Sequence, residues 1–188
     1  TGKRAAEDIQ TYNAMTGDFL FQEEERAGEG EAPSEEEVAA ARDAYRKSAG
    51  DAAARESYIR ALMRRSHTAL LKKNFNACIA DWEEVQNVDP ANVRARSNLT
   101  IAYGSLGLSY AHHGLEDEAL ELWEKALKLN PEHSGLLHNL ALVCERNGQR
   151  DKAKAYWGEV IKQWERELEK RGEDEYLRHL VDHGQATQ

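Results

Sequence analysis

A 34-residue interval separates matching residues in the second half of this 188-residue chain, between residues 100 and 167. A glycine, an alanine and a tryptophan recur at that interval: Gly114, Ala119 and Trp123, then Gly148, Ala153 and Trp157. Internal repeats of about 20–50 residues form stacked supersecondary units, because one unit alone cannot bury its apolar face. The interval therefore predicts a repeat array in which neighbouring units share one core.

Inside the first copy, small and aromatic residues follow the spacing of a two-helix repeat. The positions are Tyr103, Leu106, Gly107, Tyr110, Ala119, Trp123, Ala126 and Pro131. They reproduce the pattern aromatic-x2-Leu-Gly-x2-Tyr, then Ala-x3-aromatic, then Pro. On these residues the chain resembles the tetratricopeptide repeat (TPR) family. The resemblance implies an all-α fold: a right-handed α-solenoid of TPR helix-turn-helix repeats with flanking capping helices.

Local signals within the copy agree with a helix-turn-helix unit. The small residues Gly107 and Ala119 allow two helices to cross with their axes about 8–10 Å apart. Gly114 is expected to end the first helix in the left-handed backbone region. Pro131 disfavours helical geometry in the residue before it, so the second helix is expected to end there.

The second copy departs from the pattern at Cys144, Val160 and Glu165. Glu165 stands where a proline follows the second helix of the first copy. We therefore expect the last long helix to continue, as far as Arg171.

A displaced third copy lies upstream. It repeats the second half of the pattern at Cys78, Trp82, Val85 and Pro90. Pro90 lies 41 residues before Pro131 instead of 34, so seven residues have been added after Pro90. One interpretation is a simple linker insertion, and the other is a lengthened helix over residues 91–113. The lengthened helix would project a functional surface through Arg94, Arg96 and Asn98.

Capping signals flank the repeats. Ser34 followed by Glu37 is a capping box that opens a helix over residues 35–48, and a further helix is expected from Ala52. A short helix after Gly172 is expected to cap the other end. We therefore divide the chain into an acidic N-terminal arm with a short helix (residues 1–33), a TPR solenoid domain (residues 34–183) and a C-terminal tail (residues 184–188).

Negative charge is concentrated near the N-terminus. Residues 18–37 hold nine acidic residues and one arginine, a net charge of −8, against −9 for the whole chain. The run begins with an apolar cluster, Phe19, Leu20 and Phe21, that a solvated spacer does not need. We predict that this cluster docks the arm on the protein's own repeats, or on a second copy to form a homodimer. The acidic residues would then face Arg60, Arg64 or Arg65. The alternative is that the arm packs on the convex back of the repeats.

The resemblance implies a peptide-binding groove lined by the first helix of each unit. Carried onto this sequence, its positions are Arg60, Met63, Arg64, His67 and Leu71 in the first unit, Ile101, Ser105, Leu108 and His112 in the second, and His138, Asn139, Leu142 and Arg146 in the third. Apolar side chains with arginines and histidines around them suit a protein or peptide with apolar or aromatic anchors and acidic flanks.

Some TPR proteins hold the acidic C-termini of heat-shock chaperones with a clamp of lysines, asparagines and an arginine. The corresponding residues here are Met63, His67, Ser105, Gly135 and Asn139. The clamp is absent, which argues against a chaperone tail as the partner.

No motif in the sequence indicates catalysis, a cofactor or a metal site. His179 and His183 are four residues apart, but the cysteine pair or His-Glu-x-x-His motif of a zinc site is missing. An acidic chain without a basic stripe disfavours nucleic acid as a partner. No apolar run reaches the length of about 18 residues that direct membrane insertion requires. Cys78 and Cys144 are expected as free core thiols, which favours the cytoplasm.

We therefore expect a protein-protein interaction scaffold or adaptor, not an enzyme, that binds a partner segment in the concave TPR groove. Two alternatives remain open. One is a self-assembling structural TPR protein, and the other is a module associated with a histidine-dependent enzyme.

Overall fold

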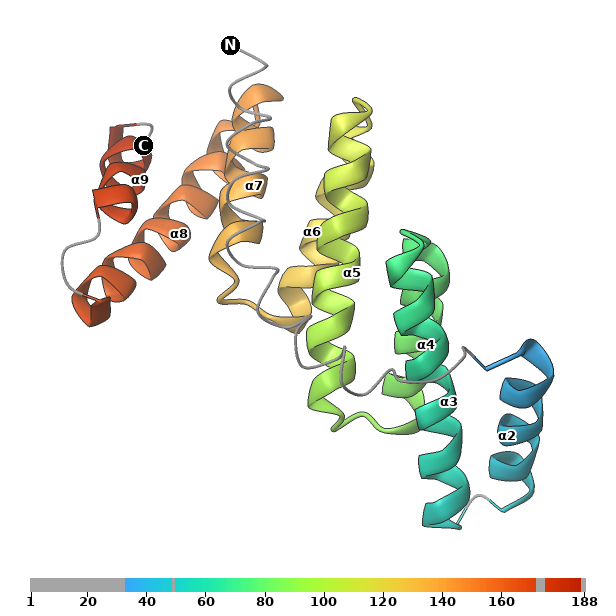
Figure 1. Cartoon of the computed structure of the whole chain (residues 1–188). Helices are drawn as coiled ribbons and strands as arrows, with labels where there is room; N and C mark the ends of the chain where they lie inside the picture. Colours follow the sequence, from blue (N-terminus) through green and yellow to red (C-terminus); the bar gives the residue numbers. More distant parts are fainter. Residues whose placement is uncertain (1–32, 49, 172–174, 187–188) are drawn as a thin grey trace. The chain divides into compact units, whose positions relative to one another are not determined.

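The computed structural model describes residues 33–48, 50–171 and 175–186, and every regular element in these ranges is an α-helix (Figure 1). The helices are α2 (Glu35–Lys47), α3 (Ala52–Leu71), α4 (Phe75–Val88), α5 (Val93–His112), α6 (Glu116–Leu129), α7 (Ser134–Arg146), α8 (Arg150–Arg171) and α9 (Glu175–Ala186). The all-α class and the helix-turn-helix organisation predicted from the repeat are therefore confirmed. Over the described residues, no helix combines the length and low polarity needed to cross a membrane.

Two parts of the predicted organisation are not settled by these helices. The N-terminal arm, with Phe19, Leu20 and Phe21, lies outside the described residues. At the other end, α9 continues to Ala186, past the domain boundary expected at residue 183. The division into arm, repeat domain and tail stays a prediction.

The chain forms two compact units, divided within α5 between Leu106 and Gly107. We call residues 33–106 the N-terminal unit and residues 107–186 the C-terminal unit. The right-handed superhelix expected from the repeats depends on how these units are placed, so its handedness stays a prediction.

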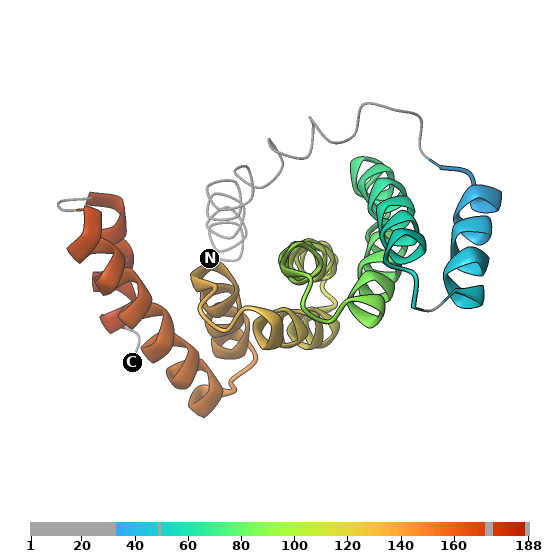
Figure 2. The ribbon, with the colours of Figure 1, turned by 90° about the horizontal axis from the view of Figure 1, so that it is seen from below.

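In the N-terminal unit, α2 packs on α3 and α3 packs on α4 (Figure 2). The capping box predicted at the start of α2 is present. The Ser34 backbone N–H donates to Oε2 of Glu37 at 2.7 Å, and the Glu37 backbone N–H donates to Oγ of Ser34 at 3.2 Å. Oδ1 of Asp51 accepts from the backbone N–H of Ala53 at 2.8 Å and caps α3 in the same way. These caps satisfy backbone donors that the first turn of a helix leaves without partners.

The core of the N-terminal unit lies between these three helices. Its buried side chains include Val38, Tyr58, Leu62, Cys78, Trp82 and Val85. The ring of Tyr45 on α2 stacks on that of Tyr58 on α3, with centroids 5.8 Å apart, and so fixes α2 against the first repeat. The phenol of Tyr58 donates to Oε1 of Glu84 on α4 at 3.1 Å.

In the C-terminal unit, α7 packs on α6 and on α8, and α9 packs on α8. Gly107 approaches the indole of Trp123 so closely that a Cβ atom added to it would lie 2.5 Å from Nε1. The sequence expectation of a tight crossing at Gly107 is therefore correct. Gly114 and Gly148 have φ angles of 78° and 70°, and both stand in the turns that follow a first helix of a repeat. A glycine takes this left-handed conformation without strain, which explains its use at both turns.

Two predictions about helix length are also confirmed. α5 is one continuous helix of 20 residues from Val93, whereas its counterpart α7 has 13 residues. The difference of seven residues adds about 10 Å, so the linker interpretation is wrong. α8 continues to Arg171, as expected where Glu165 replaces proline. Asn98 is only 8% exposed, however, so it does not belong to a surface projected by the longer helix.

Candidate functional site

Five of the expected groove residues share one face of α3. Arg60, Met63, Arg64, His67 and Leu71 follow one another at intervals of three, one, three and four residues, which places them along one side of a helix. The opposite side of α3 carries the buried residues Tyr58, Leu62, Ser66 and Ala69. We call the five residues the α3 stripe. It presents apolar and cationic side chains together on the side of α3 that faces away from its buried residues.

Exposed and half-buried side chains alternate along the α3 stripe. Leu71 is 70% exposed, the largest exposed fraction among the exposed large apolar residues of the described chain. Met63 and His67 are half-buried, and Arg60 and Arg64 are exposed. Arg60 forms an ion pair with Glu56 one turn earlier, at 2.8 Å, with both side chains largely exposed. A solvated pair of this kind is weak, so its cation remains available to compete for another carboxylate.

The helix that carries the stripe, together with the two lysines that follow it, is strongly cationic in an acidic protein. Residues 52–73 hold six arginines and lysines and one glutamate, a net charge of +5, whereas the whole chain carries −9. Positive charge concentrated on one helix attracts acidic segments over a distance of roughly one Debye length, about 8–10 Å.

Arg65 does not belong to this surface, although the sequence analysis offered it as a partner for acidic residues. Its Nε and Nη2 donate to the carboxylate of Asp81 on α4, at 3.0 Å and 2.6 Å, and its Nη1 donates to Glu35 on α2 at 2.7 Å. The Asp81 side chain is 5% exposed. Arg65 therefore joins three helices of the N-terminal unit. One of its partners, Glu35, belongs to the acidic run of residues 18–37, and a contact between Arg65 and the arm itself stays a prediction.

The electrostatics of this pair follow from its burial. Desolvation raises the pKa of the Asp81 carboxyl, and the hydrogen bonds and charge of Arg65 act in the opposite direction. The hydrogen bond to Asp81 raises the pKa of the Arg65 guanidinium. Breaking the pair would leave a carboxylate in the core without its counter-ion, which is costly.

A pocket of about 740 Å³ opens beside the pair, in the N-terminal unit. Its lining combines charged groups with a floor of small side chains: Pro33, Glu35, Arg65, Thr68, Ala69, Lys72, Asn74, Ala77, Ala80 and Asp81. Lys72 is the cation of this lining that the sequence analysis missed. It lies at the C-terminal end of α3, where positive charge is also favoured by the helix dipole.

The expected groove residues of α5 also share one face of their helix, at intervals of four, three and four residues. Ile101, Ser105 and Leu108 are half-buried, and His112, at the end of the helix, is exposed. This face is less polar than the α3 stripe because it carries no arginine or lysine.

The expected groove residues of α7 are largely inaccessible. His138 is 3% exposed and Asn139 is 1% exposed. The imidazole of His138 packs against two indoles, with centroids 5.5 Å from Trp157 and 5.4 Å from Trp164. Burial, and secondarily the charge of His183, lower the pKa of His138 to about 4. His138 is thus a neutral core residue and not an exposed groove residue.

The other three α7 positions differ among themselves. Both amide atoms of Asn139 are buried and have no hydrogen-bond partner within the described part of the chain. Leu142 is half-buried. The guanidinium of Arg146 forms an ion pair with Glu116 of α6. On α7, Arg146 is therefore exposed and Leu142 is partly accessible, whereas His138 and Asn139 are not accessible.

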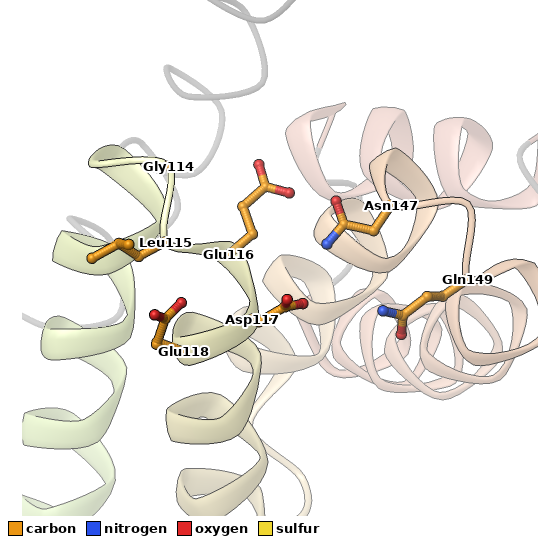
Figure 3. Close-up of a pocket in the computed structure, with 7 residues that line it drawn as sticks. All are labelled: Gly114, Leu115, Glu116, Asp117, Glu118, Asn147 and Gln149. Atoms are coloured by element: carbon orange, nitrogen blue, oxygen red, sulfur yellow. The ribbon is translucent and has the colours of Figure 1, made fainter.

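A second pocket, of about 490 Å³, lies in the C-terminal unit where α6 begins (Figure 3). Its lining is Gly114, Leu115, Glu116, Asp117, Glu118, Asn147 and Gln149. The three acidic side chains point in different directions in Figure 3. Carboxylates in a first helical turn are favoured by the helix dipole, which accounts for this composition without a ligand. Within the described ranges, no group of three or more His, Cys, Asp or Glu residues is arranged to hold a metal ion.

Comparison with known proteins supplies the family. Two models, both described as tetratricopeptide repeat, match residues 101–133 and 122–155. The chain carries tetratricopeptide repeats. The photosystem I assembly protein Ycf3 of Prochlorococcus marinus is 23% identical over 119 residues, which are 60% of this chain and 66% of that protein.

Two solved structures are also similar to the chain. MamA matches with a TM-score of 0.37 and 18% identity, over 70% of this chain and 89% of that structure. The Sgt2 TPR domain from Aspergillus fumigatus matches with a TM-score of 0.37 and 20% identity, over 66% of this chain and 75% of that structure.

The positions of the TPR carboxylate clamp have no arginine or lysine in this chain. Met63 and His67 lie on the α3 stripe, Ser105 lies on α5, and Gly135 and Asn139 are buried on α7. The cations of this TPR protein instead belong to other positions of α3, chiefly Arg60, Arg64 and the end of the helix. A carboxylate bound here would therefore meet a different arrangement of donors.

Proposed function

We propose that this TPR protein is an adaptor that binds a partner segment on the α3 stripe, with apolar or aromatic anchors and acidic flanks in the partner. The observation that carries the proposal is the exposed Leu71, together with Met63, on the same helix face as Arg60 and Arg64. A single exposed leucine is ordinary, but an apolar row flanked by cations matches an extended peptide or a helix with the complementary pattern.

The chemistry of the partner follows from the charges of α3. A net charge of +5 over residues 52–73 favours a segment with acidic residues on either side of its apolar anchors. The anchors would provide most of the binding free energy, and the acidic flanks mainly the rate of association and the choice of partner. Binding is therefore expected to weaken, but not to disappear, as salt is raised.

The family supports a non-catalytic role of this kind. Repeat scaffolds present extended surfaces to protein partners. The relative from Prochlorococcus marinus is named an assembly protein, and assembly depends on binding other proteins. Two histidines of the C-terminal unit take part in packing: His138 and His183 both lie against Trp157, with centroids at 5.5 Å and 6.1 Å.

Other expected groove positions are only half-buried and could add contacts: Ile101, Ser105 and Leu108 on α5, and Leu142 on α7. We infer that these would be secondary to α3, because they are less exposed and lack its cations.

The test is a selection of short random displayed peptides on the full chain, followed by fluorescence anisotropy with a selected peptide. L71E and R64E are expected to weaken its affinity at least about tenfold, or 1.4 kcal/mol. Both positions are exposed, so neither change disturbs the core.

Matched controls lie in the same unit. V93E alters another exposed apolar residue, 62% exposed, on α5 outside the stripe. R55E alters another exposed arginine of α3, which is about 180° away from Arg64 around the helix. Both controls should bind the peptide as the native chain does. Selected peptides that bind L71E and R64E with native affinity would place the binding surface elsewhere.

A further inference from the structure

The acidic arm joins the described structure beside the helix that carries the α3 stripe. Pro33, where the described chain begins, lines the same pocket as Arg65, Thr68 and Lys72 in the last two turns of α3. Arg64 of the stripe and Thr68 of the pocket lining are one turn apart, so the two faces adjoin along the helix. A segment leaving Pro33 towards the N-terminus therefore starts at the border of the stripe.

The arm has the reach to cover the stripe. Each residue spans at most about 3.3–3.6 Å, so the 12 residues from Pro33 back to Phe21 extend up to about 40 Å. A helix of 20 residues, the length of α3, is about 30 Å long. Every part of the stripe thus lies within reach of residues 18–32.

The charges of the two segments are opposite and equal. Residues 18–32 hold six acidic residues and one arginine, a net charge of −5, and residues 52–73 have a net charge of +5. Of the cations on α3 and in its turn, Arg65 is engaged by Asp81 and Glu35, and Arg60 by Glu56. Lys72 and Lys73 take part in no ion pair within the residues that the structure describes. They lie at the end of α3 that is closest to the arm.

The apolar groups also correspond. Phe19, Leu20 and Phe21 lie between Asp18 and the other acidic residues of the arm, and Met63 and Leu71 lie on the stripe. This is the pattern that the proposed function assigns to the partner: an apolar anchor with acidic residues on either side.

We infer that residues 18–31 of the same chain occupy the α3 stripe and close it to partners. The inference rests on the proposed function, since it assigns to the arm the surface that the partner uses. Phe19, Leu20 and Phe21 cover Met63 and Leu71, and the acidic residues lie along Arg64, Lys72 and Lys73. A partner then binds by displacing the arm.

The covalent connection between the arm and α3 determines what fraction of the time the arm occupies the stripe. A short connection gives an effective concentration of the order of 1 mM. If the free arm peptide binds the stripe with a dissociation constant of about 0.1 mM, the stripe is occupied about ten times as often as it is empty. The apparent affinity for a partner falls by about the same factor. A weak arm thus regulates binding without preventing it.

The experiment uses the full chain and a labelled synthetic peptide with the sequence of residues 17–32. The variant F19A/F21A removes the two aromatic anchors from the arm of the protein, and I9A/Y12A is the control that removes two apolar side chains from the arm outside residues 18–31. Fluorescence anisotropy is expected to show the peptide binding F19A/F21A at least about fivefold more tightly than it binds the native chain or I9A/Y12A. Adding L71E to F19A/F21A should abolish that gain, and adding V93E should not.

Methyl NMR observes the same event inside the protein. The chain has two methionines, Met15 in the arm and Met63 on the stripe, so a methionine-methyl-labelled sample gives two signals. The Met63 signal should differ between the native chain and F19A/F21A, and the free peptide should return it towards the native position. Light scattering should give the mass of a monomer for the native chain, since a dimer would mean that the arm binds a second copy.

The outcomes separate this inference from the proposed function. Equal peptide affinity for the native chain and F19A/F21A, with an unchanged Met63 signal, would overturn self-occupation while the selected peptides still bind the stripe. A peptide of residues 17–32 that does not bind F19A/F21A at all would overturn it too. Selected peptides that are indifferent to L71E would overturn the proposed function itself.

Discussion

Helices α3 and α7 are each the first helix of a repeat, but α3 is mostly accessible to solvent and α7 is mostly buried. α3 has 20 residues, of which only Tyr58, Leu62, Ser66 and Ala69 are buried, and its stripe is open. α7 has 13 residues, and the seven consecutive residues 135–141 are all buried. A repeat position alone therefore does not make a binding residue. The side chains on the neighbouring helices decide whether that position is surface or core.

The cause of the difference is visible in the packing partners. His138 on α7 faces the wide indoles of Trp157 and Trp164 on α8, and α9 adds His183 against Trp157. Gly184 of α9 lies so close to α8 that an added Cβ would be 2.9 Å from Cγ1 of Ile161. On α3 the corresponding face carries arginines, which keep their charged ends in water.

The largest expected loss of stability comes from a substitution in the packed core between α7 and α8. Trp157 is 1% exposed, and W157A is expected to destabilise the C-terminal unit by about 3–5 kcal/mol, because it removes an indole and leaves a cavity. L71A, at a residue that is 70% exposed, should change stability by less than about 0.5 kcal/mol. Chemical denaturation followed by circular dichroism measures both. Similar losses of stability in W157A and L71A would contradict the view that α7 and α8 form a packed core while the α3 stripe is exposed.

The burial of His138 makes the stability of the C-terminal unit depend on pH. Burial lowers the pKa of His138 to about 4 from an ordinary value of 6.5, so the unfolded chain binds a proton more readily than the folded chain. Its stabilising contribution is therefore complete above pH 6.5 and is lost as pH falls towards 4. Between pH 7 and pH 5 the loss is about 2 kcal/mol.

The control for this dependence is H138F, which keeps an aromatic ring and removes the titration. Denaturation at pH 7 and pH 5 should show a larger loss of stability in the native chain than in H138F. An equal loss in both would mean that His138 is not buried in its neutral form.

A smaller loss of stability is expected when the ion pairs of Arg65 in the N-terminal unit are removed. R65M should destabilise by about 1–2 kcal/mol, since it leaves Asp81 buried without its counter-ion; the partial exposure of Arg65 keeps the loss below that of a fully buried pair. R64M changes the adjacent residue, which belongs to the exposed stripe, and should cost less than about 0.5 kcal/mol. Thermal denaturation of the two variants shows whether Arg65 stabilises the fold while the adjacent Arg64 does not. An R64M loss as large as that of R65M would contradict this division.

Local features of the fold were predictable from the sequence because they depend on adjacent residues. Ser34 and Glu37 form their capping box, Gly114 takes a positive φ, and Glu165 allows α8 to continue. The candidate site was less predictable, because it depends on contacts between helices. Nothing in the immediate neighbourhood of His138 indicates that two tryptophans, 19 and 26 residues later, will cover it.

One missed contact did have a signal in the sequence. Asp81 stands among the core positions of α4, one residue before the buried Trp82 and three after Cys78. A carboxylate on an apolar helix face requires a cation from another helix. That requirement pointed to one arginine of α3 being used internally, although it did not say which.

The central claim is that partners bind α3 rather than α7, and leucine-methyl NMR of the full chain with a selected peptide tests it most directly. Leu71 lies on the stripe, and Leu142 is the half-buried leucine of α7. Saturating peptide is expected to move the Leu71 signal clearly and the Leu142 signal little or not at all. A peptide that moves Leu142 and leaves Leu71 in place would contradict it.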